Sequence, residues 1–342
     1  MTSESDGPTN NKNLKWAMGA VGVVAVLATV VAVVLLFGGG GSGTPSGPRS
    51  DLGSAPDSAA GVASAKDTGP IAVITEDPSC IAWTGINNEL ASSGTGLWNE
   101  RDRSVPASAW TPKLRAQYIA AAQSMRGAAA QTVGLVKLTP HRVMRELYQQ
   151  FIAYARAYAE RVPKYTPADN TLAGTANSAS SALGAICAAI SDGSAAARGP
   201  LVQPSSQPSD IAPVGNPANP QPFLTSANSA CGDWKSSLDQ FGKNTADWQK
   251  LDPNVPAIYW NREQKAVNYA VAPVMNAFAS TMEQIGRQSD NAIWQDFANL
   301  SAQYRRAFVV SLPTYTPTDN HLANAANYAS TTILGACVAV GS

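Results

Sequence analysis

The chain has 342 residues, of which 44% are hydrophobic and 14% charged, so it holds enough apolar side chains for about two domains with buried cores. Lys and Arg together number 24, as do Asp and Glu, and the net charge is therefore zero. A neutral chain lacks the basic excess that displaces counterions from phosphates, which argues against nucleic-acid binding. Two histidines and four cysteines leave little material for a metal site, and we expect neither metal nor cofactor.

Residues 16–37 predict a transmembrane helix that lies in the lipid bilayer. This run of 22 residues carries no charge, and as a helix it would be about 33 Å long, enough to cross the hydrocarbon layer. Lys12 and Lys15 precede the run, whereas residues 38–48 are uncharged. The positive-inside rule therefore places residues 1–15 in the cytoplasm and everything after residue 37 outside it.

A cleaved signal peptide is the alternative for the same segment. Its apolar region would be shorter, about 7–15 residues, and a site of the A-x-A type would follow. Neither feature is present, which favours an uncleaved anchor in a single-pass protein of the cell membrane.

Two segments have the composition of linkers. Residues 38–70 consist mainly of Gly, Ser, Ala, Pro and Asp and predict a flexible tether. Residues 191–222 contain seven prolines, whose spacing favours extended, semi-rigid polyproline II segments.

An internal repeat organises the rest of the chain. The stretch 163–173 recurs at 313–323, and the same offset of 150 residues aligns many further identities, among them Trp110 with Trp260. We therefore predict a duplicated module at 71–190 and 223–342.

Each copy predicts a bundle of four helices. The fourth helix begins after Thr166 in the first copy and Thr316 in the second, each followed by Pro and, three residues on, by an acid that completes a capping box. Apolar residues then recur in steps of four and three, which is typical of the seam of an antiparallel bundle. Almost nothing predicts a strand, so the expected fold class is all-α.

The second helix and the loop before it are less regular. The helix is expected over about 112–136 and 257–285, with a bend at Pro273. The preceding stretch carries Trp98 and Trp110, or Trp248 and Trp260, and we expect an ordered loop packed on the bundle.

The cysteines occupy equivalent places in the two copies, which favours one bridge within each: Cys80 with Cys187, and Cys231 with Cys337. The start of the first helix and the end of the fourth lie at the same end of such a bundle, so the geometry agrees. An extracytoplasmic location permits disulfides. Free buried thiols are the alternative.

A search for catalytic residues finds little. His141 and His321 align with Asn291 and Thr171, so neither is shared by the copies, and no nucleophile, zinc or phosphate-loop motif occurs. Paired carboxylates could hydrolyse a glycan, but helix capping explains the shared pair Asp169 and Asp319. We expect a protein that is not an enzyme.

Polar and aromatic residues that the copies share, and that packing does not fully demand, are the candidate binding residues. Local hydrogen bonding and packing are the structural alternative for them. The tryptophan-bearing loops form a second candidate surface, since Trp and Arg anchor interfaces. The candidate residues are Arg156, Tyr165, Asn170 and Asn177 in the first copy and Arg306, Tyr315, Asn320 and Asn327 in the second.

The Val-rich span 21–36, the linker 38–70 and the two Y-T-P-x-D-N segments at Tyr165 and Tyr315 resemble envelope proteins of actinobacteria, mycobacteria in particular. The resemblance implies a cell-envelope location and transfers no functional residue.

These observations predict a membrane-anchored interaction module that binds an envelope protein or a cell-wall component. A carrier or receptor for a lipid or other amphiphile is the second hypothesis, and it requires an apolar cavity of several hundred Å³. An envelope hydrolase is the third, and it requires two carboxylates that converge in a cleft.

Overall fold

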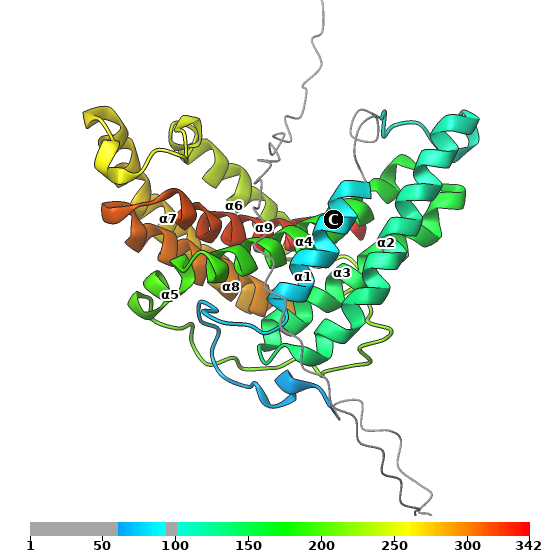
Figure 1. The fold of residues 1–342 in the computed structure, drawn as a ribbon, viewed down its shortest axis with the longest axis horizontal. Coiled ribbons are helices and arrows are strands. Elements are labelled where there is room, and N and C mark those ends of the chain that lie inside the picture. Colours follow the sequence, from blue (N-terminus) through cyan, green and yellow to red (C-terminus); the bar gives the residue numbers. More distant parts are fainter. Residues whose placement is uncertain (1–60, 94–100) are drawn as a thin grey trace, which may run out of the picture. The chain divides into compact units, whose positions relative to one another are not determined.

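The computed structural model describes residues 61–93 and 101–342, and within them the chain forms nine α-helices and no strand (Figure 1). This confirms the all-α fold class. The predicted anchor 16–37 lies outside the described residues, and none of the described helices is long and apolar enough to cross a membrane. The helices are α1 (Cys80–Ser93), α2 (Pro112–Leu138), α3 (Arg142–Arg161), α4 (Asn170–Ser191), α5 (Ser194–Arg198), α6 (Cys231–Asn244), α7 (Arg262–Gln288), α8 (Ala292–Ser311) and α9 (Asn320–Ala339).

Four long helices form a bundle in each copy, α1–α4 in the first and α6–α9 in the second. The predicted capping boxes are present: the backbone amides of Thr166 and Thr316 donate to Asp169 and Asp319 at 2.7 and 2.9 Å. The helix of the second copy that was expected from residue 257 begins only at Arg262, because residues 257–259 form a 3₁₀ turn. It runs on through Pro273 as one element.

Both predicted disulfides are present, Cys80–Cys187 and Cys231–Cys337, and neither of them links the two copies. Each ties the first helix of a bundle to its last, as the shared bundle end requires.

The two copies pack against each other through α4 and α9, the most extensive helix contact of the described chain. Small side chains allow this approach. A Cβ atom added to Gly335 on α9 would lie 2.5 Å from Oγ1 of Thr175 on α4, so the backbones meet at van der Waals distance there. At the 150-residue offset the same pair becomes Ala325 and Ala185, which are both buried.

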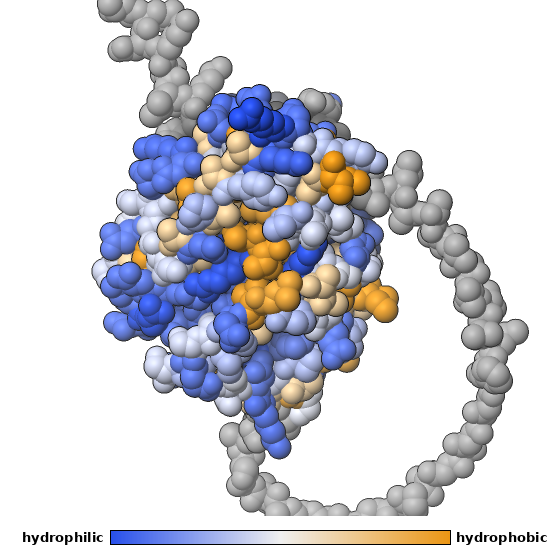
Figure 2. All heavy atoms as spheres, turned by 90° about the vertical axis from the view of Figure 1, so that its left-hand side faces the viewer, coloured by the Kyte–Doolittle hydropathy of each residue, from blue (hydrophilic) through white to orange (hydrophobic). Residues whose placement is uncertain are grey.

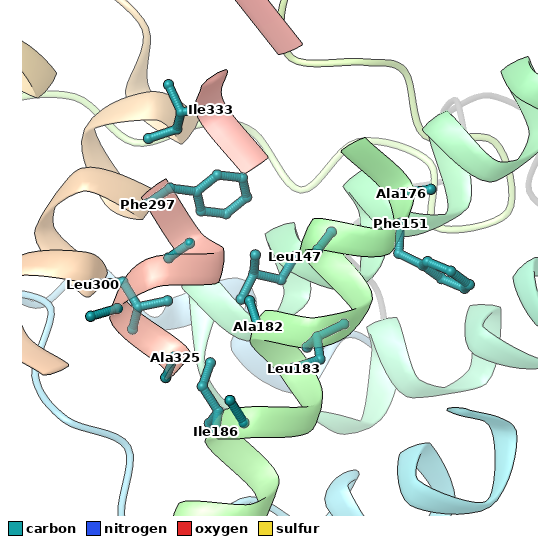
Figure 3. Packing of buried hydrophobic residues seen from close by; sticks show 14 of the residues in the cluster. Leu147, Phe151, Ala176, Ala182, Leu183, Ile186, Phe297, Leu300, Ala325 and Ile333 are labelled. Carbon is teal, nitrogen blue, oxygen red and sulfur yellow. The ribbon is translucent and has the colours of Figure 1, made fainter. Parts of the chain in front are cut away.

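A single hydrophobic core therefore runs through both copies. Figure 3 shows Leu147 of α3 and Ala182 of α4 lying in one apolar layer with Phe297, Leu300 and Ala325 of the second copy. The described residues, 61–93 and 101–342, accordingly belong to one compact unit. The two copies thus pack directly on each other, because each bundle covers the other's apolar face.

The segments that lead into the two bundles each contact the opposite copy. Before α1, the amide and carbonyl of Ile74 both lie 3.3 Å from the hydroxyl of Tyr304 on α8. Before α6, the amide of Phe223 donates to Gln150 on α3 of the first copy at 2.9 Å, while its ring meets that of Phe297 of its own copy edge to face. The segment before each bundle therefore forms hydrogen bonds that help to hold the two copies together.

The segments expected as linkers also lie on the helices. Within the tether 38–70, Asp67 accepts a hydrogen bond from the amide of Arg142 at 2.6 Å. Within 191–222, Arg198 binds the carboxylate of Asp319 at 3.0 and 3.1 Å. Ser205 bonds Ile71 at 2.8 and 2.9 Å. The described parts of both segments thus follow the surface of the bundles, because buried polar groups of the helices hold their backbone and side chains.

The α4–α9 crossing can be tested by a substitution cycle in the purified full-length protein. Gly335→Ala should lower the free energy of unfolding by about 1–3 kcal/mol, because the new methyl group meets Thr175. The double variant T175A/G335A should recover most of the loss, since it reproduces the Ala185–Ala325 contact of the same interface.

Gly174→Ala is the matched control. It lies on the exposed side of α4 with no atom near its added Cβ, so it should stabilise the helix by up to about 1 kcal/mol. Urea unfolding measures all four proteins. A Gly335→Ala variant as stable as Gly174→Ala would show that the helices do not cross this closely.

Candidate interaction surface

The loop before the second helix is built in the same way in both copies, around the candidate tyrosines. In the first copy, the carbonyl of Tyr165 accepts from the amide of Ala107 at 2.9 Å, and its hydroxyl donates to the carbonyl of Arg103 at 2.9 Å. The indole of Trp110 donates to Val105 at 2.9 Å and stacks on Tyr118. The predicted ordered loop is thereby confirmed for the described part, while Trp98 lies outside it.

The second copy repeats these contacts. The carbonyl of Tyr315 accepts from Ala257 at 2.9 Å, its hydroxyl donates to Pro253 at 2.6 Å, and Trp260 stacks on its ring. Burial raises the pKa of Tyr165 and of Tyr315, so both phenols stay protonated. The structure therefore places these two candidate residues beneath the loops, where they hold the loop backbone.

The tips of the two loops differ. Ile258 and Tyr259 of the second copy are 79% and 73% exposed, although both are large and apolar in character. Their equivalents in the first copy, Ser108 and Ala109, are exposed but small. We call residues 258 and 259 the Ile-Tyr tip. The sequence carried a signal for it, since two bulky residues replace Ser and Ala in otherwise matching loops, but we did not predict it.

The charges that flank the Ile-Tyr tip cancel. Residues 247–265 contain three basic side chains, Lys250, Arg262 and Lys265, and three acidic ones. Lys250 is already paired with Asp247 at 2.7 Å. The tip is thus an apolar protrusion in a neutral surrounding.

The surface of the second copy also shows apolar groups between polar ones (Figure 2). The face on the side of the second copy that Figure 2 turns toward the viewer carries an apolar strip between polar side chains. Grooves are present between α6 and α7 and beside the Cys80–Cys187 disulfide, with volumes of about 470 and 850 Å³.

The remaining candidate residues do not come together in one site. Arg156 donates to the carbonyl of Ala218 at 2.6 Å, whereas Arg306 forms an ion pair with Glu283 at 2.5 and 2.7 Å. Asn170 accepts from Arg101 at 3.3 Å. The others lie on the two fourth helices: Asn320 is half-buried, and Asn177 and Asn327 are exposed.

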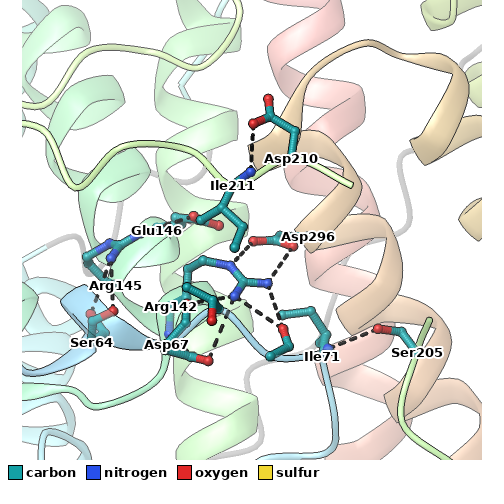
Figure 4. A network of polar contacts seen from close by, with 12 residues as sticks. Ser64, Asp67, Ile71, Arg142, Arg145, Glu146, Ser205, Asp210, Ile211 and Asp296 are labelled. Carbon is teal, nitrogen blue, oxygen red and sulfur yellow. Dashed lines mark hydrogen bonds and ion pairs between the residues drawn. The ribbon is translucent and has the colours of Figure 1, made fainter. Parts of the chain in front are cut away.

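A buried polar cluster joins α3 to α8, and the sequence reasoning missed it (Figure 4). The guanidinium of Arg142 binds the carboxylate of Asp296 through two hydrogen bonds of 2.6 and 3.1 Å, and neither side chain is exposed. Arg145 lies 3.3 Å from Glu146, which is fully buried. We call these four residues the inter-copy cluster.

Glu146 and Asp296 are an equivalent pair of acids at the 150-residue offset. Asp102 and Asp252 form a further shared pair, so the expectation that Asp169 and Asp319 are the acids shared by the copies was wrong. Burial raises the pKa of Glu146 well above its ordinary value, and the negative charge of Asp296 raises it further, against the effect of Arg145. Enclosed in the interior and bound to arginines, these carboxylates hold the copies together and do not form the cleft that a glycan would require.

Neither histidine side chain bonds to the residues of the inter-copy cluster. His141 contacts the carbonyl of Glu76 at 2.9 Å, and His321 lies 3.1 Å from Asp192. In the part of the chain that the structure describes, no three His, Cys, Asp or Glu side chains come together as metal ligands would.

Comparison with known proteins places the chain among mycobacterial proteins, as its composition suggested. Residues 62–341 match the family described as mycobacterial ESX-1 associated protein. An uncharacterised protein of Mycolicibacterium smegmatis is 45% identical over 334 residues, which cover 98% of this chain and 88% of that relative. No solved structure matches.

The inter-copy cluster predicts a pH dependence of stability that Glu146→Gln should remove. Because the pKa of Glu146 is higher in the folded protein, its stabilising effect is complete below about pH 4.3, the unfolded value, and is lost as the pH rises through the folded-state pKa. From pH 5 to 8 the variant should therefore gain in free energy of unfolding relative to the wild type, by at most about 1.4 kcal/mol per pH unit.

Asp296→Asn is the companion variant for this measurement. It removes the buried, doubly hydrogen-bonded partner of Arg142 and leaves only the more distant carboxylate of Asp67, 3.8 Å away, so the variant should lose about 3–5 kcal/mol. Urea unfolding across the pH range measures both. If E146Q and the wild type changed in parallel with pH, Glu146 would not hold the proton assigned to it.

Proposed function

The chain belongs to the mycobacterial ESX-1 associated family, and from this premise we propose that it is a non-catalytic, membrane-anchored module that binds another protein of the ESX-1 secretion system outside the cytoplasm. The Ile-Tyr tip is the observation that carries the proposal. The proposed membrane anchor and the proposed protein binding rest on separate arguments.

The anchor rests on residues 16–37 and the location on the two disulfides. An uncharged run of 22 residues is long enough to span a bilayer, and the lysines before it favour a cytoplasmic N-terminus. All four cysteines of the chain are paired, and disulfides persist in oxidising compartments. Both arguments favour a location of the two bundles outside the cytoplasm.

This topology predicts the activity of a reporter. Alkaline phosphatase fused after residue 342 should be active in cells, because the enzyme folds only outside the cytoplasm, and the same fusion to a chain lacking residues 16–37 should be inactive. Activity is measured in intact cells and compared with the amount of fusion protein. An inactive full-length fusion that accumulates normally would contradict the proposed location.

The Ile-Tyr tip supports protein binding because two large side chains are held in water by a rigid loop. Tyr is among the residues that dominate binding energy at protein interfaces, and a loop backbone that is ordered before binding loses little entropy. The buried Trp260 and Tyr315 provide this rigidity. Burying Ile258 and Tyr259 in a partner would contribute about 3–6 kcal/mol, at 1.5–3 kcal/mol per large side chain.

The neutral surrounding favours a protein over a membrane surface. Binding to anionic lipid gains about 1 kcal/mol for each nearby basic residue, and that gain needs an excess of positive charge. Around the Ile-Tyr tip the three basic residues are matched by three acidic ones. We therefore propose a partner protein that offers an apolar pocket for the tip.

The double variant I258S/Y259A tests the proposed binding. It replaces the tip with the type of residues found in the first copy, Ser108 and Ala109, so the loop should still fold. Full-length protein purified in detergent from the membranes of a mycobacterium should retain a stoichiometric protein partner, and the variant should bind it at least about 100-fold more weakly. Quantitative mass spectrometry and a titration with the identified partner provide the measurement.

Ile81→Ser is the matched control, since Ile81 is 89% exposed but lies on α1 of the other copy. It should bind the partner as the wild type does. Retention of the partner by I258S/Y259A, or equal loss in I81S, would overturn the role of the tip.

A further inference from the structure

Each copy has a groove between its first two helices, and the two grooves are equivalent. In the second copy α6 and α7 enclose about 470 Å³, and in the first α1 and α2 enclose about 290 Å³. At the offsets that align the copies, Phe241 and Phe278 of the larger groove correspond to Leu90 and Ala128 of the smaller one. The residues that line the groove therefore differ between the copies, whereas the pairs of helices that form it are equivalent.

Behind the larger groove lies a buried arginine. The guanidinium of Arg305 on α8 is 4.5 Å from the ring centroid of Phe241 and 4.9 Å from that of Phe278. The two rings stack on each other with centroids 4.1 Å apart, and both line the groove. In the first copy the equivalent residue is Ala155. Arginine and both phenylalanines thus occur together in one copy and are all absent from the other.

Arg305 has hydrogen-bond donors without an acceptor. Its side chain is more than nine-tenths buried, and neither Nε nor Nη2 meets an oxygen of the described chain. Burial lowers its pKa to about 9, so the group remains charged at neutral pH. A buried charge without a hydrogen-bonded counterion is strongly unfavourable, and the contacts with the two rings offset only part of that. An anion at this position would accept hydrogen bonds from Nε and Nη2 and would balance the buried charge of Arg305.

We propose that the α6–α7 groove binds a single-chain amphiphile whose carboxylate or phosphate head reaches Arg305. Arg305 does not itself line the groove: both phenylalanine rings line it and contact the guanidinium from the groove side, so the head reaches the charge when a ring moves aside. The apolar chain lies along Phe241, Phe278 and Val274. The volume falls in the range of small-molecule sites, and open access along the helices admits a flexible chain. This site is separate from the Ile-Tyr tip and goes beyond the proposed function.

Photolabelling of the full-length protein tests the site. The probe is a palmitate analogue with a diazirine in its chain, and mass spectrometry of peptides locates the label. Labelling should concentrate on residues 237–244 and 273–281. Palmitate and hexadecyl phosphate should compete with the probe, and the better competitor identifies the head group. Hexadecanol, which has the same chain and no charge, should compete at least tenfold less well.

Arg305→Ala, which introduces the residue of the first copy, should lower labelling of the groove at least tenfold. Arg287→Ala removes an exposed arginine from α7 and should label as the wild type does. Palmitate should raise the melting temperature of the wild type and of R287A but not of R305A. I258S/Y259A should label normally, so this experiment is independent of partner binding.

Three results would overturn the proposal: equal labelling of R305A and wild type, equal competition by hexadecanol, or labelling spread over the surface. A variant that fails to fold is recognised by its melting curve. In that case Arg305→Lys, which keeps the charge, and F241L/F278A, which gives the lining of the first copy, replace it: the first should retain labelling and the second should lose it.

Discussion

The close crossing of α4 and α9 is the contact on which the rest of this structure depends. Ala, Ser, Thr and Gly at the crossing let two helix backbones meet, with Gly335 against Thr175 as the tightest point. Each bundle then covers an apolar face of the other, so the duplicated sequence folds as one unit with one core. Two separate bundles would leave these faces in water.

Because the copies are fixed together, buried polar groups can bridge them. Arg142 and Asp296 satisfy each other across the interface, and the crossed segments before α1 and α6 add hydrogen bonds from each copy to the other. A buried ion pair contributes little net stability, but its parts are costly to leave unpaired. Such a cluster therefore specifies one way of assembling two similar halves. The two copies share the arrangement of their four long helices. They differ at the Ile-Tyr tip and in the α6–α7 groove.

The sequence predicted what depends on local patterns and on the repeat. Short motifs predicted the helix caps at Thr166 and Thr316 and the four helices of each copy. The equivalent positions of the cysteines predicted both disulfides. The structure confirms these predictions. The α4–α9 contact was not predicted, because a stripe of small residues is equally compatible with a groove. The identity of Tyr165 and Tyr315 in the two copies predicts a binding surface, whereas in the structure both residues hold the loop. Differences between the copies, at residues 258, 259 and 305, indicate candidate functional positions better than their identities do.

Contact between the Ile-Tyr tip and a partner protein is the basis of the proposed function. The most direct measurement is site-specific photo-crosslinking in living mycobacteria, with benzoylphenylalanine at position 259 and, for comparison, at position 109 of the equivalent loop. We expect one protein adduct from position 259 and none from position 109. Absence of an adduct at 259, or the same adducts from both loops, would contradict the proposed contact.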